Sequence, residues 1–130
     1  MECYTPSDNI AEYTARANDE GLESTFEGWL KVSNLSKKDA LFIFSVGGGN
    51  EKKKVSMNIV HAIKFAKKMK SKIFSIVGKN DGFAYKHSDI KILIPNIDSN
   101  LVTPYSEAFQ AVVWHCIVSH PKLMVNKTKW

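Results

Sequence analysis

The sequence predicts a layered α/β fold built on a parallel β-sheet. Three short apolar runs, at 40–46, 72–77 and 90–94, have the length and composition of strands. A helical period covers 55–69 between the first two runs, and another helical stretch, from about 106 to 119, follows the third. Strands joined by helical or loop crossovers pair in parallel and are buried on both faces. We therefore expect one parallel sheet in a layered α/β domain.

The part of the chain before residue 40 predicts a short extended piece and two helices. The extended piece is Glu2-Cys3-Tyr4-Thr5, and the helices lie near 8–16 and 20–31. The second helix is amphipathic, because three glutamates alternate with large apolar side chains along it. We expect a single domain over 1–122, followed by a polar tail over 123–130.

Composition limits the class of protein. The chain has 130 residues, of which 44% are hydrophobic, enough to bury the core of one domain. No apolar segment approaches the roughly 20 residues that span a bilayer, and the first residues lack the regions of a signal peptide. We expect a cytoplasmic protein with no membrane partner. Cys3 and Cys116 show no metal-ligand spacing and are expected to be reduced, packed thiols.

The positive charge does not predict a nucleic-acid partner. A formal charge of +5 makes nucleic-acid binding a function to consider. However, Arg16 is the only arginine, whereas bidentate recognition of bases and phosphates favours arginine. Lys64, Lys67 and Lys68 lie on the polar side of a helix with an apolar opposite side, which is typical of a solvated face.

A run of three glycines follows the first predicted strand, within FSVGGGNEKKKVSMN at 44–58. Consecutive glycines lose much chain entropy on ordering and bury no side chain, so a plain connection rarely explains them. A loop that leads into a helix offers backbone N–H groups to an anion such as phosphate. A flexible surface turn is the alternative, because the run fits neither the P-loop nor the dinucleotide-binding pattern.

Two polar, glycine-containing loops are expected at one edge of the sheet. Residues 45–56 follow the first strand, and residues 78–82 follow the second. In an open parallel sheet, ligands bind outside the carboxyl ends of the strands. These loops are therefore the predicted place for a ligand.

The last helix carries polar residues on an apolar background. It is apolar almost all round from Ala108, and we expect it to be buried. At about 100° per residue, Glu107, Gln110 and His115 fall within roughly 140° and can face one cleft. A buried glutamate is costly unless paired, metal-bound or neutral, so Glu107 and His115 make a candidate acid/base or metal pair. Alternatively, Glu107 lies in an exposed first turn and His115 is a hydrogen-bonded core residue.

The joint order of several motifs resembles the sugar isomerase (SIS) domain, and in particular its phosphoheptose isomerase branch. The resemblance extends from about residue 3 to 120. The matching segments are Phe44-Ser45, Ser56-Met57-Asn58-Ile59-Val60-His61-Ala62-Ile63, Ile76-Val77-Gly78-Lys79-Asn80-Asp81-Gly82, Ser88-Asp89-Ile90, and the pattern Thr103, Glu107, Gln110, His115.

This resemblance implies a three-layer α/β sandwich that forms dimers or tetramers and isomerises sedoheptulose 7-phosphate through an enediol. A hydroxyl-rich loop after a strand holds the phosphate in such enzymes. Ser45 matches the start of that loop and Ser56 its end, where the serine would cap the helix. The segment from Gly47 to Lys54 resembles an insertion, so Gly47 and Gly48 are expected to line the phosphate site with backbone.

The resemblance also implies roles for other residues. Asn18 and Asp19 match a substrate-contacting pair, and Gln110 belongs to the same substrate site. His115 matches a catalytic histidine that also ligates zinc in some members. Glu107 stands where a glutamine is usual, a change that keeps an oxygen able to bind metal. The sequence requires no cofactor, and zinc at Glu107 and His115 is an option.

One departure concerns the first βα unit of these enzymes, which carries a phosphate loop and a catalytic glutamate and has no match in this chain. Its strand would lie between the extended piece at 2–5 and the strand at 40–46. The first hypothesis is a phosphosugar isomerase that is incomplete as one chain. Either the chain is a fragment of a longer gene product, or a homo-oligomer or partner chain supplies the missing unit, or the core is repaired differently. The second is a non-catalytic phosphosugar-binding module that regulates or scaffolds.

Overall fold

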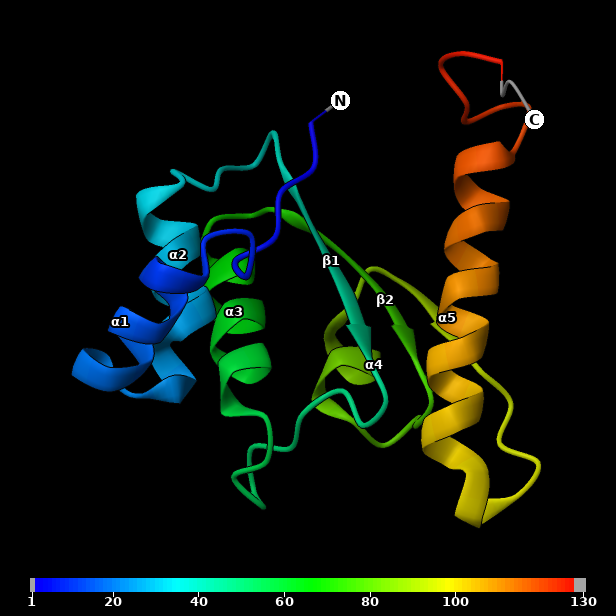
Figure 1. The fold of residues 1–130 in the computed structure, drawn as a ribbon, viewed down its shortest axis with the longest axis horizontal. Helices are drawn as coiled ribbons and strands as arrows, with labels where there is room; N and C mark the ends of the chain where they lie inside the picture. Colours follow the sequence, from blue (N-terminus) through cyan, green and yellow to red (C-terminus); the bar gives the residue numbers. More distant parts are fainter. Residues whose placement is uncertain (1, 128–130) are drawn as a thin grey trace.

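The three strands form one parallel sheet in a computed structural model that describes residues 2–127 (Figure 1). They are β1 (Ala40–Ser45), β2 (Lys72–Val77) and β3 (Ile90–Leu93), in the spatial order β1-β2-β3. Both strand pairs are parallel, and the register places Phe42 opposite Phe74 and Ile76 opposite Ile92. The strands, the pairing direction and the crossovers agree with the sequence prediction.

Helices cover both faces of the sheet, which makes three layers (Figure 1). On one side lie α1 (Ile10–Glu20), the short 3-10 helix η1 (Leu22–Ser24), α2 (Thr25–Val32), α3 (Met57–Lys68) and α4 (Phe83–His87). On the other side lies α5 (Val102–Ser119), which follows the 3-10 helix η2 (Ser99–Leu101). The predicted three-layer α/β sandwich is confirmed.

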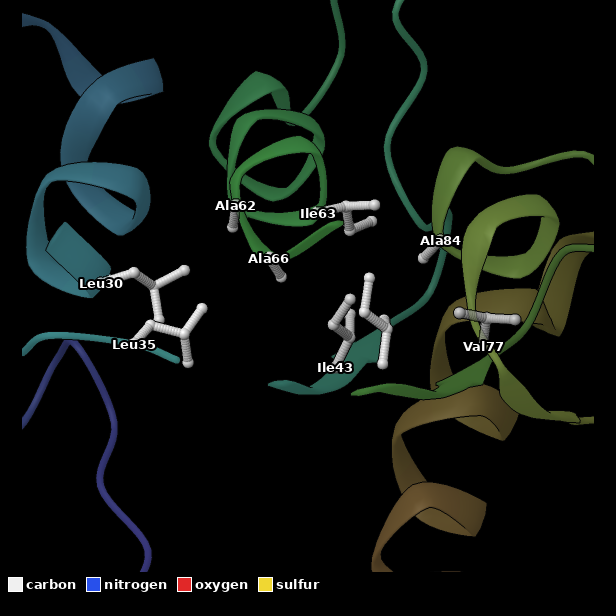
Figure 2. Packing of buried hydrophobic residues seen from close by; sticks show 9 residues of the cluster. Leu30, Leu35, Ile43, Ala62, Ile63, Ala66, Val77 and Ala84 are labelled. Carbon is white, nitrogen blue, oxygen red and sulfur yellow. The ribbon is translucent and has the colours of Figure 1, made fainter. Parts of the chain in front are cut away.

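The hydrophobic core lies between the sheet and α3 (Figure 2). Alternate strand residues face this side: Ile43 from β1 lies below α3, and Val77 from β2 lies below Ala84 of α4. On α3, Ala62, Ile63 and Ala66 recur at helical spacing, and the two alanines let the helix approach the sheet closely. The cluster is completed by Leu30, Leu35, Ile73 and Ala84.

The opposite face of the sheet is only partly covered. Phe44 of β1 follows the core residue Ile43, so strand alternation turns it to the side of α5, and it keeps 44% of its surface exposed. The prediction that α5 is buried is wrong for this chain, because Ser106 is the only buried residue of that helix. Val112 and Val118 are 52% and 51% exposed. Among residues 2–127, α5 packs mainly on β1, β2 and η2, so the side of the helix turned away from them faces solvent.

Several boundaries differ from the predicted ones. Residues 2–5 pair with no strand, so β1 is an edge of the described sheet. Gly21, with φ +88°, ends α1 and separates it from α2, whereas the sequence predicted one helix over 20–31. The helix α4 was not predicted, because its five residues are too few for a clear period.

Two further findings concern the cysteines and the helices. Cys3 and Cys116 are free, as predicted, but both are exposed rather than packed. No helix within residues 2–127 combines the length and apolar character that crossing a membrane requires.

Candidate functional site

Three segments meet at the carboxyl end of β1 and β2. The loop after β1 contacts the loop after β2 through a hydrogen bond from the Gly78 N–H to the Val46 carbonyl, at 3.0 Å. The first turns of α5 lie against the same place, because a Cβ atom on Gly78 would overlap the hydroxyl of Ser106. The edge predicted from the two loops therefore exists, and α5 begins beside it.

The glycine run is a packed connection and not a flexible surface turn. Gly48 and Gly49 are buried and have φ values of +69° and +76°, a region that favours glycine. Their carbonyls accept hydrogen bonds from the N–H groups of Ala84 and Phe83, each at 2.8 Å. These carbonyls satisfy two N–H groups of the first turn of α4 that would otherwise lack a partner.

The absence of a side chain at Gly82 allows the glycine run to lie directly against the start of α4. A Cβ atom on Gly82 would overlap the carbonyl oxygen of Gly47. At Gly47, by contrast, an added Cβ would have no atom within 4 Å. Gly47 therefore faces open space at the carboxyl edge, while Gly48 and Gly49 face the protein.

Ser45 stands at the end of β1 with its side chain turned into this loop. Its hydroxyl oxygen accepts a hydrogen bond from the Gly48 N–H at 3.0 Å. A serine hydroxyl can also donate one hydrogen bond, and that capacity is not used by this contact. Ser45 is half-buried, so the hydroxyl is positioned but still accessible.

Ser56 does not cap α3, and that prediction is wrong. Its backbone is left-handed, with φ 47° and ψ 51°, and its side chain makes no capping hydrogen bond. A capping serine needs an extended backbone to turn its hydroxyl toward the first free N–H groups. Asn58 accepts the bond from the Ile59 N–H instead, at 2.9 Å.

The segment between the two serines forms a small hairpin. Asn50 and Val55 exchange two backbone hydrogen bonds, at 2.9 and 3.0 Å. The turn carries three exposed lysines at 52–54, and Glu51 pairs with Lys64 of α3. This hairpin overlaps most of the segment from Gly47 to Lys54 that the sequence marked as an insertion, and it places positive charge beside the carboxyl edge.

The predicted residues of α5 have different environments. Gln110 is half-buried, and its side-chain amide donates to the Ile76 carbonyl at 3.0 Å. Glu107 is exposed, and so is His115, whose ring stacks on Trp114 with centroids 3.8 Å apart. Within residues 2–127, Glu107 and His115 share no hydrogen bond or ion pair.

Asn18 and Asp19 lie far from these groups in the fold. They are exposed near the end of α1, where the Asn18 amide donates to the Asp19 carboxylate at 3.0 Å. Because α1 and α5 belong to opposite outer layers, the single chain does not bring this pair together with Glu107 and His115 (Figure 1). The structure groups Ser45, Gly47 and Gly48 at one edge. It leaves Asn18 and Asp19 apart from Glu107 and His115.

The described part of the chain contains no group of three or more histidine, cysteine or carboxylate side chains able to hold a metal ion. A zinc ion at Glu107 and His115 would therefore need further ligands from another chain or from solvent. The option raised by the sequence stays a prediction.

Ser106 is the residue of this edge that sequence reasoning missed. It is 1% exposed, and its hydroxyl donates to the Val102 carbonyl at 2.6 Å. A lone serine in an apolar helix gave a weak signal, since such residues commonly bond back to their own helix. The signal that could have found it is a pair of small residues, Ser106 in α5 and Gly78 after β2. Together they allow the helix to contact the end of the strand.

Asp89 lies at the opposite, amino edge of the sheet. Its carboxylate accepts a hydrogen bond from the Ile73 N–H at 2.8 Å, and Lys72 lies 3.4 Å away. The hydrogen bond from the backbone, assisted by the charge of Lys72, holds the pKa of Asp89 below its usual range. The Ser88-Asp89-Ile90 motif therefore joins the start of β3 to β2.

A parallel three-layer α/β sandwich with glycine-lined loops at its carboxyl edge is also the fold of solved phosphoheptose isomerases. The chain is a homologue of phosphoheptose isomerases. It is 33% identical over 91 residues to the phosphoheptose isomerase of Buchnera aphidicola from Schizaphis graminum, covering 69% of this chain and 43% of that protein. The phosphoheptose isomerase of Helicobacter pylori is 27% identical over 112 residues, which cover 86% of this chain and 55% of the relative.

A further relative matches most of this chain. The lincomycin biosynthesis protein LmbN of Streptomyces lincolnensis is 29% identical over 119 residues, covering 88% of this chain and 42% of that protein. The chain thus spans about half the length of the curated relatives it matches. No family model matches the chain.

Solved structures show the same fold. A phosphoheptose isomerase from Francisella tularensis superimposes with a TM-score of 0.68 at 20% identity, over 85% of this chain and 56% of that one. The phosphoheptose isomerase from Neisseria gonorrhoeae gives a TM-score of 0.68 at 18% identity, over 88% of this chain and 61% of the other.

Proposed function

We propose that this chain binds a sugar phosphate at the carboxyl edge of its sheet and contributes this site to an aldose–ketose isomerase. The proposed substrate is sedoheptulose 7-phosphate or a close relative, converted through an enediol. The observation that carries the proposal is the loop after β1, where the Ser45 hydroxyl is fixed by the Gly48 N–H beside the open space at Gly47.

The chemistry of this loop suits a phosphate group. The Ser45 hydroxyl can donate one hydrogen bond, and the Gly47 N–H has no acceptor among residues 2–127. The amino end of the 12-residue helix α3 follows the loop and adds the positive end of its dipole. The lysines at 52–54 raise the local concentration of an anion. We place Ser45, Gly47, Gly48 and Ser56 around the phosphate.

Isomerisation through an enediol requires a positioned base and a group that moves the hydroxyl proton. We assign His115 to one of these roles and Glu107 to orienting it, with Asn18, Asp19 and Gln110 as substrate contacts. Glu107 and His115 belong to α5, which lies in the layer opposite α1, the helix of Asn18 and Asp19. One active site with all of these residues therefore needs more than one chain.

Exposed apolar side chains support such an association. The sheet face beside α5 presents Phe42 and Phe44, and α5 presents Phe109, Val112 and Val118, all of them about half exposed. Large exposed apolar patches mark interaction surfaces. A second copy or a partner chain that covers this surface would complete the layer over β1 and can bring a catalytic base.

Ligand binding tests the proposal directly. Sedoheptulose 7-phosphate is titrated by calorimetry into the wild-type chain and into Ser45→Ala, with Ser33→Ala as the matched control at the end of α2. We expect Ser45→Ala to weaken binding about fivefold or more, since one hydrogen bond to a charged group is lost. Equal affinities for all three proteins would reject the phosphate loop.

A non-catalytic phosphosugar-binding module is the second candidate. The exposure of Glu107 and His115, and the use of the Gln110 amide by the Ile76 carbonyl, favour it. Both candidates require sugar phosphate binding, and turnover separates them. Conversion of sedoheptulose 7-phosphate by a complete assembly that contains this chain, and its loss in His115→Ala, would select the enzyme.

A further inference from the structure

A basic pocket lies at the amino edge of the sheet, opposite the carboxyl edge. Its volume is about 390 Å³, and it opens where α3 passes into β2 and α4 ends, near the upper end of the strands in Figure 1. The charged and titratable residues of its lining are Lys67, Lys70, Lys72, Lys86, His87 and Asp89.

The lysines of this pocket are not neutralised by neighbouring carboxylates. Four lysines and one aspartate leave a formal charge of +3 with the histidine neutral. Asp89 is already engaged, since it accepts from the Ile73 N–H and pairs with Lys72. Lys67, Lys70 and Lys86 form no ion pair within the described residues 2–127.

Helix dipoles account for only part of this charge. Lys67 belongs to the last turn of α3, and Lys86 to the last turn of α4. A helix carboxyl end carries about half a negative charge, so α3 offsets about half of one positive charge, whereas α4, with five residues, is too short to add much. About two and a half positive charges therefore remain uncompensated. Like charges gathered in one pocket repel each other, and a bound anion would relieve that repulsion.

We propose that this pocket binds a small molecule that carries two or more linked phosphate groups. The volume lies in the range of small-molecule sites, about 300–1,000 Å³. The residual charge exceeds the −1.5 to −2 that a single phosphate monoester carries at about pH 7. Lysine binds phosphate as a point charge, which suits a flexible chain of phosphates.

A nucleic acid fits this pocket less well. The lining contains no arginine for bidentate contacts, and its only ring is that of His87, which stacks on Phe83 at 3.8 Å between centroids. The pocket is also separate from the loop of Ser45, because the two lie at opposite ends of β2. Its ligand therefore does not compete with the sugar phosphate.

Calorimetric titration of the full chain with tripolyphosphate in metal-free buffer tests the proposal. We compare the wild type with Lys70→Gln, Lys86→Gln and the double variant, and use Lys122→Gln, an exposed lysine after α5 and outside both sites, as the matched control. Each pocket substitution is expected to weaken binding about two- to fivefold, and the double variant about tenfold. The effects are modest because contacts between an exposed lysine and a phosphate are screened by solvent. Raised salt should weaken binding further.

Three outcomes would overturn the proposal. In the first, Lys122→Gln weakens tripolyphosphate binding as much as the pocket variants do. In the second, inorganic phosphate binds as tightly as tripolyphosphate. In the third, a single-stranded oligonucleotide binds more tightly and displaces tripolyphosphate. Because all the substituted lysines are exposed, far-UV circular dichroism should be the same for every variant, so loss of binding reports on the pocket itself.

Discussion

The side-chain amide of Gln110 donates a hydrogen bond to the backbone carbonyl of Ile76, at 3.0 Å. The bond joins α5, whose residues are otherwise mostly exposed, to the central strand of the sheet. The same glutamine is a predicted substrate contact. Its amide nitrogen is therefore shared between holding the helix and any contact with a ligand.

Replacing this glutamine should cost stability first. We expect Gln110→Ala to lower the free energy of unfolding by about 1 kcal/mol, the usual net value of such a hydrogen bond. Urea unfolding followed by circular dichroism measures the change. Glu107→Ala is the matched control on the same helix, because Glu107 is exposed and should change stability by less than about 0.5 kcal/mol. Equal stability of both variants would contradict a structural role for Gln110.

Gly47 and Gly82 touch in the fold, but substituting them should affect stability differently. We expect Gly82→Ala to destabilise the chain by about 1–3 kcal/mol, because the new Cβ would overlap the Gly47 carbonyl and force the loop away from α4. Gly47→Ala should leave stability within about 0.5 kcal/mol, since its Cβ would meet open space. Thermal unfolding of the two variants decides this, and similar melting temperatures would show that the loop yields easily.

Asp89 predicts a specific loss of stability in acid. Its pKa is lowered in the folded state, first by the hydrogen bond from the Ile73 N–H, so it stabilises the fold above the ordinary carboxyl value of 3.8. This contribution is lost as the pH falls from that value through the lower folded pKa. Between pH 5 and about pH 2, the unfolding free energy of Asp89→Asn should therefore fall less steeply than that of the wild type.

The loop aspartate Asp81 supplies the comparison for that experiment. It is exposed, and its carboxylate makes no hydrogen bond or ion pair within residues 2–127. Asp81→Asn should keep the wild-type slope of stability against pH. A wild-type slope in Asp89→Asn as well would remove Asp89 from the explanation of acid unfolding.

The parts of the fold that were predictable are those with a local pattern. The strands at 40–45, 72–77 and 90–93 are short apolar runs, and α3 repeats its apolar residues at helical spacing. The exposure of α5 was not predictable, because an apolar helix has the same sequence whether its cover comes from its own chain or from another. Sequence shows composition, and the covering surface is a tertiary property.

The candidate site shows the same limit. The carboxyl edge could be located, since both loops follow strands that pair in parallel. The left-handed backbone of Ser56, which removes the predicted helix cap, depends on how the hairpin from Asn50 to Val55 closes. The need for glycine at Gly82 comes from contact with Gly47, more than thirty positions earlier. Neither feature has a local signature.

The last prediction is that this chain alone does not isomerise sedoheptulose 7-phosphate. The resemblance to phosphoheptose isomerases assigns one catalytic base to a glutamate that no residue of this chain matches. His115 can supply the second group, but it is exposed and contacts Trp114 rather than a carboxylate. Loss of general acid or base assistance typically costs about 10²–10⁴-fold in rate. The purified chain, assayed with and without zinc, should form at most a trace of heptose phosphate.

Two results would decide against this expectation or sharpen it. Robust turnover by the isolated chain would require a base within its own residues, and Glu107→Gln would be the first variant to assay, because it keeps the shape of the side chain and removes its basicity. Light scattering on the same preparation reports whether the chain associates. If it does, Phe44→Asp should favour the monomer, because a charge would then have to be buried in the contact. Activity that disappears together with association would place the base across an interface between copies.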